Sequence, residues 1–106
     1  AAPAAGAPDG TATMMGMAST TELEALRDAT GRDAEVLFLQ LMIRHHEGGV
    51  LMARAALDRS THDAVTTMAG AIDRAQRGEI ETMTAMLTER GAVPLPSLLA
   101  EGAHQH

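Results

Sequence analysis

Sulfur and imidazole side chains recur at helical spacing in this sequence and could together bind a soft metal ion. Met42 lies three residues before His45, with His46 next to it, and Met83 lies three residues before Met86. Residues three apart share one face of a helix. The sequence contains no cysteine, so methionine and histidine are its soft or borderline ligands. Neutral thioether sulfur suits Cu(I) far better than iron, zinc or calcium, which predicts a copper site with Cu(I) favoured over Cu(II).

Further methionines extend the candidate set beyond these two pairs. A sulfur cluster precedes the first predicted helix, and Met52 is a candidate for which a packing role is favoured, because methionine also fills gaps in cores. Of two adjacent histidines on a helix, one commonly points inward and the other outward. Gln76 and Glu79 are expected to orient the imidazoles by hydrogen bonds. The predicted metal ligands are Met14, Met15, Met17, Met42, His45, His46, Met52, Met83 and Met86.

A short helix is the first element that the sequence predicts. Ser19 with Glu22 and Thr21 with Glu24 offer two overlapping capping boxes, in each of which the two residues bond each other's backbone. The helix is expected over roughly 21–30, and Gly31 is expected to end it.

Two long helices are predicted to follow, over roughly 34–59 and 64–90. Asp33 is expected to cap the first of them. The Gly48–Gly49 pair within that helix predicts close packing or a mild kink. The sequence STHD at 60–63 predicts the turn between the helices, and Gly91, followed by two prolines, ends the second helix.

These elements predict an all-α fold, a long antiparallel helical hairpin with the short helix beside it. Residues 1–18 are expected to form a flexible, methionine-containing arm, 19–91 the helical domain and 92–106 a C-terminal tail. Two long helices cannot cover each other's apolar stripes completely. We therefore expect either the short helix or a second copy of the chain, in a homodimer that completes a four-helix bundle, to cover the remainder.

Folding the hairpin about the turn near 61–62 brings polar and sulfur groups together. They then share one level midway along the bundle: Met42, His45 and His46 on the first long helix, and Gln76, Glu79 and Met83 on the second. Burying such polar groups is costly unless they are bonded. This level therefore predicts either mutual hydrogen bonds or a metal ion, whereas the neighbouring Glu47 is expected to point outward.

Composition and charge exclude several functions. The formal net charge is -6, and a single aromatic residue, Phe38, is present, so neither a basic footprint nor base stacking supports nucleic-acid binding. The lack of cysteine excludes disulfides and zinc fingers. No apolar run approaches about 18 residues, so membrane insertion is not expected. Residues 1–18 lack the features of a signal peptide and fit either the start of a mature secreted protein or a linker cut from a longer chain.

Two runs of this sequence together resemble a known family. Residues 38–53 read FLQLMIRHHEGGVLMA, and residues 72–83 read IDRAQRGEIETM. They resemble the signature of the family known as domain of unknown function 305: a Phe, a Met four residues later, a His–His pair and a closing Met–Ala, then Ile, Gln, Glu–Ile and Met. The methionine-rich segment before the first helix is similar to the family's lead-in, so the resemblance covers about 14–88.

The resemblance implies a ferritin-like helical bundle, an extracytoplasmic location and an association with copper binding and resistance. It implies that Met42, His45, His46 and Met83 are the positions that matter most. Two departures stand out: Ala34–Glu35 occurs where the family often has Phe–Asp, and Met occurs at position 86 where it often has Trp.

We therefore expect an extracytoplasmic copper-binding protein that sequesters or carries the ion, with no enzymatic activity. Two alternatives stay open. A structural or interaction module without metal would use the polar level as a hydrogen-bond network that fixes the register of the helices. A metal-dependent redox enzyme is less consistent with the sequence, because the inward face lacks a carboxylate-rich set.

Overall fold

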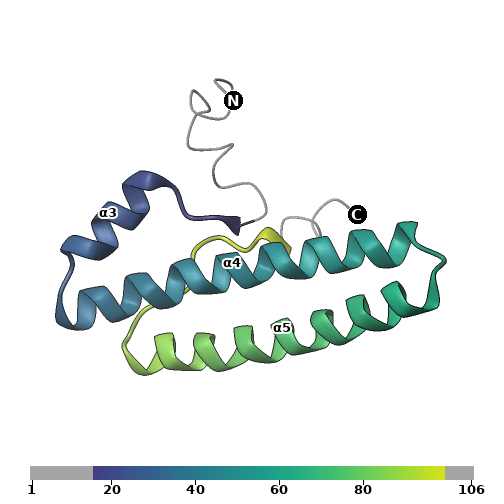
Figure 1. The fold of residues 1–106 in the computed structure, drawn as a ribbon. Helices are drawn as coiled ribbons and strands as arrows, with labels where there is room; N and C mark the ends of the chain where they lie inside the picture. Colours follow the sequence, from purple (N-terminus) through teal and green to yellow (C-terminus); the bar gives the residue numbers. More distant parts are fainter. Residues whose placement is uncertain (1–15, 100–106) are drawn as a thin grey trace, which may run out of the picture.

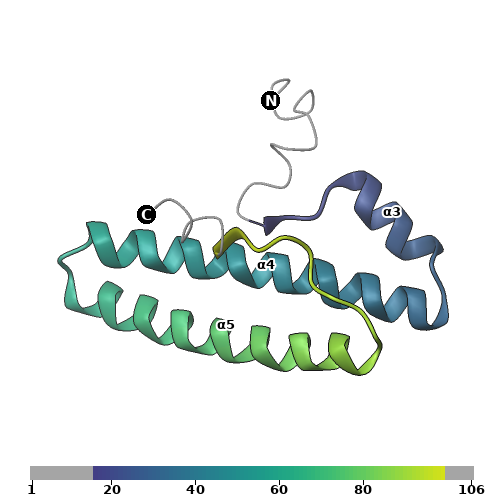
Figure 2. The same ribbon diagram turned by 180° about the vertical axis from the view of Figure 1, so that it is seen from behind.

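The computed structural model describes residues 16–99, which form a helical hairpin with a shorter helix packed against the first part of its first long helix (Figure 1). The helices are α3 (Thr20–Asp28), α4 (Gly31–Arg59) and α5 (Asp63–Glu89), and no strand occurs among these residues. In both views α4 and α5 lie side by side and antiparallel, and α3 lies at the start of α4 (Figure 2). The predicted all-α hairpin with a short N-terminal helix is confirmed.

The start of α3 is fixed by the first of the two predicted capping boxes, that of Ser19 with Glu22. Ser19 Oγ accepts a hydrogen bond from the Glu22 N–H at 3.1 Å, and Glu22 Oε1 accepts one from the Ser19 N–H at 2.9 Å. These bonds satisfy two backbone donors that the first turn of a helix leaves without a partner.

The connection between α3 and α4 differs from the prediction. Gly31 does not end the short helix, because α3 ends at Asp28 and Gly31, with a φ of +59°, is the first residue of α4. Asp33 is not the cap either. The cap position belongs to Thr30, which makes no side-chain cap bond, and Asp33 lies in the first turn, where a negative charge is favourable to the helix dipole.

The end of α5 follows the predicted glycine signal. Gly91 has a φ of +70°, and its N–H bonds the Thr88 carbonyl while the Ala92 N–H bonds the Leu87 carbonyl, both at 3.0 Å. This pair of bonds is the Schellman motif, in which a left-handed glycine closes the last turn of a helix.

The chain after α5 returns along α4 (Figures 1 and 2). The Gln40 side-chain amide donates a hydrogen bond to the Val93 carbonyl at 2.8 Å, and the Leu98 N–H donates one to Glu47 Oε1 at 3.3 Å. Residues 92–99, which the sequence assigned to a tail, therefore pack on the hairpin.

The apolar core lies near the end of the hairpin away from the turn. Leu39, Ile43 and Leu87 are almost fully buried there, and Val36, Ile80, Met83 and Ala92 pack around them. Toward the turn the buried side chains are smaller, namely Val50, Ala53 and Ala69. Within residues 16–99, no helix is both long and apolar enough to span a membrane.

Replacing Leu87 with alanine tests this core. Leu87 is 0% exposed, so the truncation leaves a cavity and should lower the free energy of unfolding by about 2–5 kcal/mol. The matched variant Leu23→Ala removes the same atoms from a side chain that is 54% exposed and should cost less than about 1 kcal/mol. Urea denaturation followed by circular dichroism measures both, and equal losses would show that the core lies elsewhere.

Candidate functional site

His46 forms the polar contact between the two long helices. Its Nδ1 lies 2.8 Å from the carbonyl oxygen of Met42, one turn earlier on α4, and its Nε2 lies 2.7 Å from Glu79 Oε1 on α5. The His46 side chain is 14% exposed and that of Glu79 is 62% exposed. The bond therefore lies at the edge of the helix interface, where it joins α4 to α5 at the predicted polar level.

These two bonds determine whether His46 can bind a metal. A carbonyl oxygen only accepts hydrogen bonds, so Nδ1 of His46 carries a proton. Nε2 either donates to the Glu79 carboxylate or accepts a proton from a neutral Glu79 carboxyl group. In both cases neither ring nitrogen has a free lone pair, so His46 in this arrangement serves the helix pairing.

His45 lies in a different environment from its neighbour. It is exposed, and its ring centroid is 6.2 Å from that of His46, with the planes at 66°. His45 and Met42 line a pocket of about 210 Å³ between α3 and α4, whose walls include Ala18 and Phe38. Of the two predicted imidazoles, His45 is the one that shares a pocket with a predicted thioether ligand.

The segment before α3 passes directly over this part of α4. Gly16 has a φ of +89°, and a Cβ at that position would lie 2.2 Å from the Arg44 carbonyl oxygen and 3.0 Å from the His45 Cα. The absence of a side chain therefore allows the backbone at Gly16 to contact α4 beside His45. Met17 follows at once and is 57% exposed, whereas Met14 and Met15 lie outside the described residues.

An ion pair holds α3 against α4 next to the pocket. The Arg44 guanidinium donates to Glu22 Oε1, and both side chains are mostly buried. This hydrogen bond from Arg44, together with the Ser19 N–H and hydroxyl, holds the pKa of Glu22 below its ordinary value of 4.5 against the opposing effect of burial. The pair therefore fastens the wall of the pocket without using Met42 or His45.

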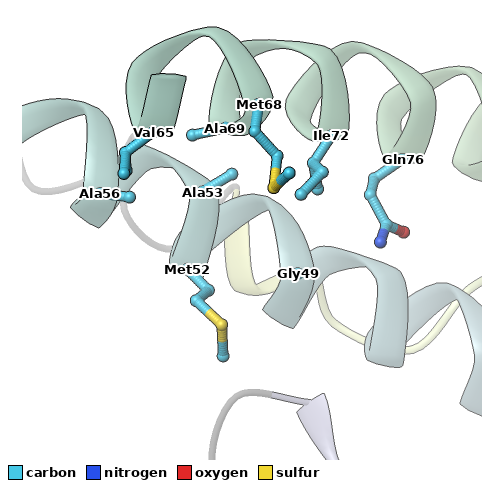
Figure 3. A pocket seen from close by; sticks show the side chains of 9 residues that line it. All are labelled: Gly49, Met52, Ala53, Ala56, Val65, Met68, Ala69, Ile72 and Gln76. Atoms are coloured by element: carbon cyan, nitrogen blue, oxygen red, sulfur yellow. The ribbon is translucent and has the colours of Figure 1, made fainter. Parts of the chain in front are cut away.

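The remaining sulfur atoms are dispersed. Met83 packs against the Leu39, Ile43 and Leu87 cluster of the core, and the pocket that Met42 and His45 share has no lining residue from α5. Met86 is 37% exposed and Met52 is 58% exposed. Figure 3 shows the Met52 side chain pointing away from α5.

Gln76 and Glu47 complete the polar residues of this level. The Gln76 amide lies over Gly49, where a Cβ would come within 2.9 Å of Nε2, which confirms the predicted close packing at the glycine pair. Gln76 Oε1 is buried without a hydrogen-bond partner among residues 16–99. Glu47 does not point outward, as the sequence suggested. It is 4% exposed, because residues 92–99 cover it and the Leu98 N–H bonds its carboxylate.

Three residues at or near the site were missed at the level of sequence: Gly16, Arg44 and Glu47. Gly16 interrupts a run of methionines, which was a local signal for a close backbone contact. Arg44 and Glu47 carried no such signal, since their partners come from other elements.

Among residues 16–99, no group of three or more His, Asp or Glu side chains is placed to hold a metal ion.

Comparison with known proteins places the chain in a family. It matches the family described as Domain of unknown function (DUF305) over residues 2–87. The chain belongs to the DUF305 family. A crystal structure of a DUF305 protein from Streptomyces coelicolor, provisionally described as secreted, matches at 40% sequence identity with a TM-score of 0.73. The match covers 78% of this DUF305 chain and 51% of that protein, so this chain spans about half the length of its relative. No curated protein matches it.

The Glu22–Arg44 pair predicts how the stability of this DUF305 chain depends on pH. Because the pKa of Glu22 is lower in the folded state, the pair's contribution is full above the ordinary value of 4.5 and is lost as the pH falls through the folded value. Glu22→Gln keeps the capping box but removes the charge, and should lower the free energy of unfolding at pH 7 by up to about 1 kcal/mol. At pH 3 the difference between the variant and the parent should be smaller than at pH 7.

Urea denaturation at both pH values measures this difference. Glu24→Gln is the matched control, because Glu24 is exposed on the same helix, and its small effect should not change with pH. A Glu22→Gln effect of the same size at pH 3 and pH 7 would contradict the assigned role of the charge.

Proposed function

We propose that this protein binds a copper ion, with Cu(I) favoured, at the pocket between α3 and α4. Met42 and His45 would be the ligands that α4 supplies. The observation that carries the proposal is that both side chains line the same pocket, beside the backbone contact of Gly16 with His45. Thioether sulfur with imidazole is a donor set that suits Cu(I).

The division between the two histidines supports His45 as the imidazole ligand. Both nitrogens of His46 are engaged by oxygen atoms, so binding a metal there would require the contact with Glu79 to break. His45 has no such bond among the described residues and lies three residues after Met42, on the same face of α4. Binding at His45 therefore leaves the helix pairing intact.

The arm before α3 is the proposed source of further sulfur ligands. Gly16 anchors it on α4, so the neighbouring Met17 starts beside the pocket, and Met15 and Met14 precede the anchor by one and two positions. Two or three thioethers with one imidazole would supply the low coordination number and soft ligands that Cu(I) accepts. Met52, Met83 and Met86 are not needed for this set.

The proposed role is to sequester or carry copper rather than to transform a substrate. Thioethers and a neutral imidazole hold a soft ion without adding an acid, a base or a nucleophile that a reaction would use. We also propose an extracytoplasmic location, which is supported by the provisional description of the Streptomyces relative as secreted. A thioether forms no disulfide, so such a site is not lost to disulfide formation in an oxidising compartment.

Titration with Cu(I) in competition with a chromogenic chelator, without oxygen, tests the copper site. His45→Ala and Met42→Leu should each weaken binding by about tenfold or more, because each removes a ligand. His46→Ala and His62→Ala should leave the affinity within about threefold of the parent, which is well under 1.4 kcal/mol. Gly16→Ala, which displaces the arm but keeps every ligand, should also weaken binding.

Two results would contradict the proposed site. One is a parent affinity no tighter than that of the His45→Ala variant. The other is a loss of Cu(I) affinity in His46→Ala as large as the loss in His45→Ala, since this would place the metal ligands at the interface of α4 and α5.

A second candidate function is a structural or interaction module in which the polar level sets the register of the hairpin. The bond from His46 to Glu79 favours it, because it ties one position of α4 to one position of α5. Buried or half-buried polar pairs can select one alignment of two helices over its neighbours. This role and copper binding at His45 involve different side chains and are separable by experiment.

The register role predicts a loss of stability in metal-free protein. Glu79→Gln should lower the free energy of unfolding by up to about 1 kcal/mol, since His46 is then bonded by a neutral amide in place of a carboxyl group at a partly exposed position. Glu81→Gln, at an exposed position of the same helix, is the control and should change little. Denaturation in the presence of a copper chelator measures both, and equal values would remove the support for this candidate.

A further inference from the structure

One face of the hairpin presents exposed apolar side chains at both of its ends. At its end near the turn it presents Val65, Met68 and Ile72, which are 43%, 65% and 40% exposed, and at the other end Phe38 and Met86, which are 49% and 37% exposed. We name this surface the open face. Phe38 and Ala56 are 18 residues apart on α4, as are Met68 and Met86 on α5. Eighteen residues make five full helical turns, so each pair lies on one line of its helix.

The two ends of the open face differ in shape. Near the turn, a groove of about 340 Å³ lies between α4 and α5, and its α4 side is lined by the small residues Gly49, Ala53 and Ala56 together with Met52. Figure 3 shows the side chains of Met68 and Ile72 on the α5 side of this groove. At the other end Phe38 and Met86 are large and half exposed. The end near the turn is therefore hollow between its two helices, with Met52 and Met68 exposed beside the hollow, and the other end carries the bulk of Phe38 and Met86.

We propose that a second copy of this chain packs antiparallel on the open face, so that two hairpins form a four-helix bundle. A twofold axis across the middle of the hairpin brings the bulky end of each copy to the hollow end of the other. A twofold axis along the helices would instead place the hollow end of one copy on the hollow end of the other. This would leave voids, which are costly in a packed interface.

The register of the hairpin agrees with this axis. The pair Phe38 and Ala56 is centred on Glu47, and the pair Met68 and Met86 is centred on Arg77. His46 bonds Glu79, and Gln76 lies over Gly49, so the level of Glu47 on α4 matches that of residues 77–78 on α5. A single axis perpendicular to both helices therefore passes through both centres.

The area of the open face is sufficient for a stable dimer. α4 has 29 residues, which gives a length of about 43 Å, and two helices side by side are about 20 Å wide. The face thus offers about 800 Å², which is about what each partner buries in a standard interface. The exposed side chains at its two ends are apolar, with His45 and Glu79 exposed between them, and apolar patches of this kind are more typical of an interface than of a free surface.

Sedimentation equilibrium of the 106-residue chain with a copper chelator present tests the dimer independently of the proposed copper site. The expected mass is twice the 11.1 kDa of one chain. Met68→Glu places a charge in the interface and should raise the dissociation constant by about 100-fold. Thr67→Glu adds the same charge at the neighbouring exposed position and should leave the dimer intact. Circular dichroism confirms that each variant is folded.

Cross-linking tests the orientation, and the parent chain has no cysteine to interfere. An oxidised mixture of the Met68→Cys and Met86→Cys variants should form a disulfide between the two, while each variant alone should form few. A parent chain that sediments as a monomer at about 100 μM would overturn the proposal. So would a Met68→Glu variant that dimerises like the parent, or a mixture that cross-links no better than the single variants.

Discussion

Two helices that lie side by side can bury only one stripe of each, and this limit determines how α4 is surrounded. α5 covers the stripe that contains Leu39 and Ile43. α3 and the segment at Gly16 cover the side that contains Leu41 and His45, and residues 92–99 cover the side that contains Glu47. α3 and the two segments are too short to fold alone. Their order therefore depends on the apolar surface of α4 that α5 leaves uncovered.

The features of the fold that could be predicted from the sequence are those that depend on residues close together in the chain. The Ser19 capping box and the glycine at 91 satisfy backbone groups within one turn, so the residues that make the contacts are adjacent in the chain. Gly31 carried an ambiguous signal, because a left-handed glycine can follow one helix or begin the next. The burial of Glu47 could not be predicted, since it depends on a segment about 50 residues further along the chain.

The same distinction, between local signals and contacts with distant segments, applies to the candidate site. Helical spacing placed His46 near Glu79, and the structure confirms that contact. Spacing could not assign the two histidines to two partners, because adjacent residues differ by about 100° around a helix and either could have faced α5. The hydrogen bonds resolve this, since Nδ1 and Nε2 of His46 are both engaged. Met83 faced the predicted side of α5, but the packing of Leu39 and Leu87 places it in the core.

This separation has a physical consequence for the proposed role. The contacts that hold the pocket in place are the Glu22–Arg44 pair, the capping box of α3 and the backbone contact of Gly16. None of them uses the sulfur of Met42 or the ring of His45, so these ligands can rearrange without loosening the hairpin. An ion that is carried and then transferred requires such ligands, because exchange proceeds through intermediates in which the incoming partner replaces them one at a time. A site whose ligands also held α4 to α5 would have to open the fold to release its ion.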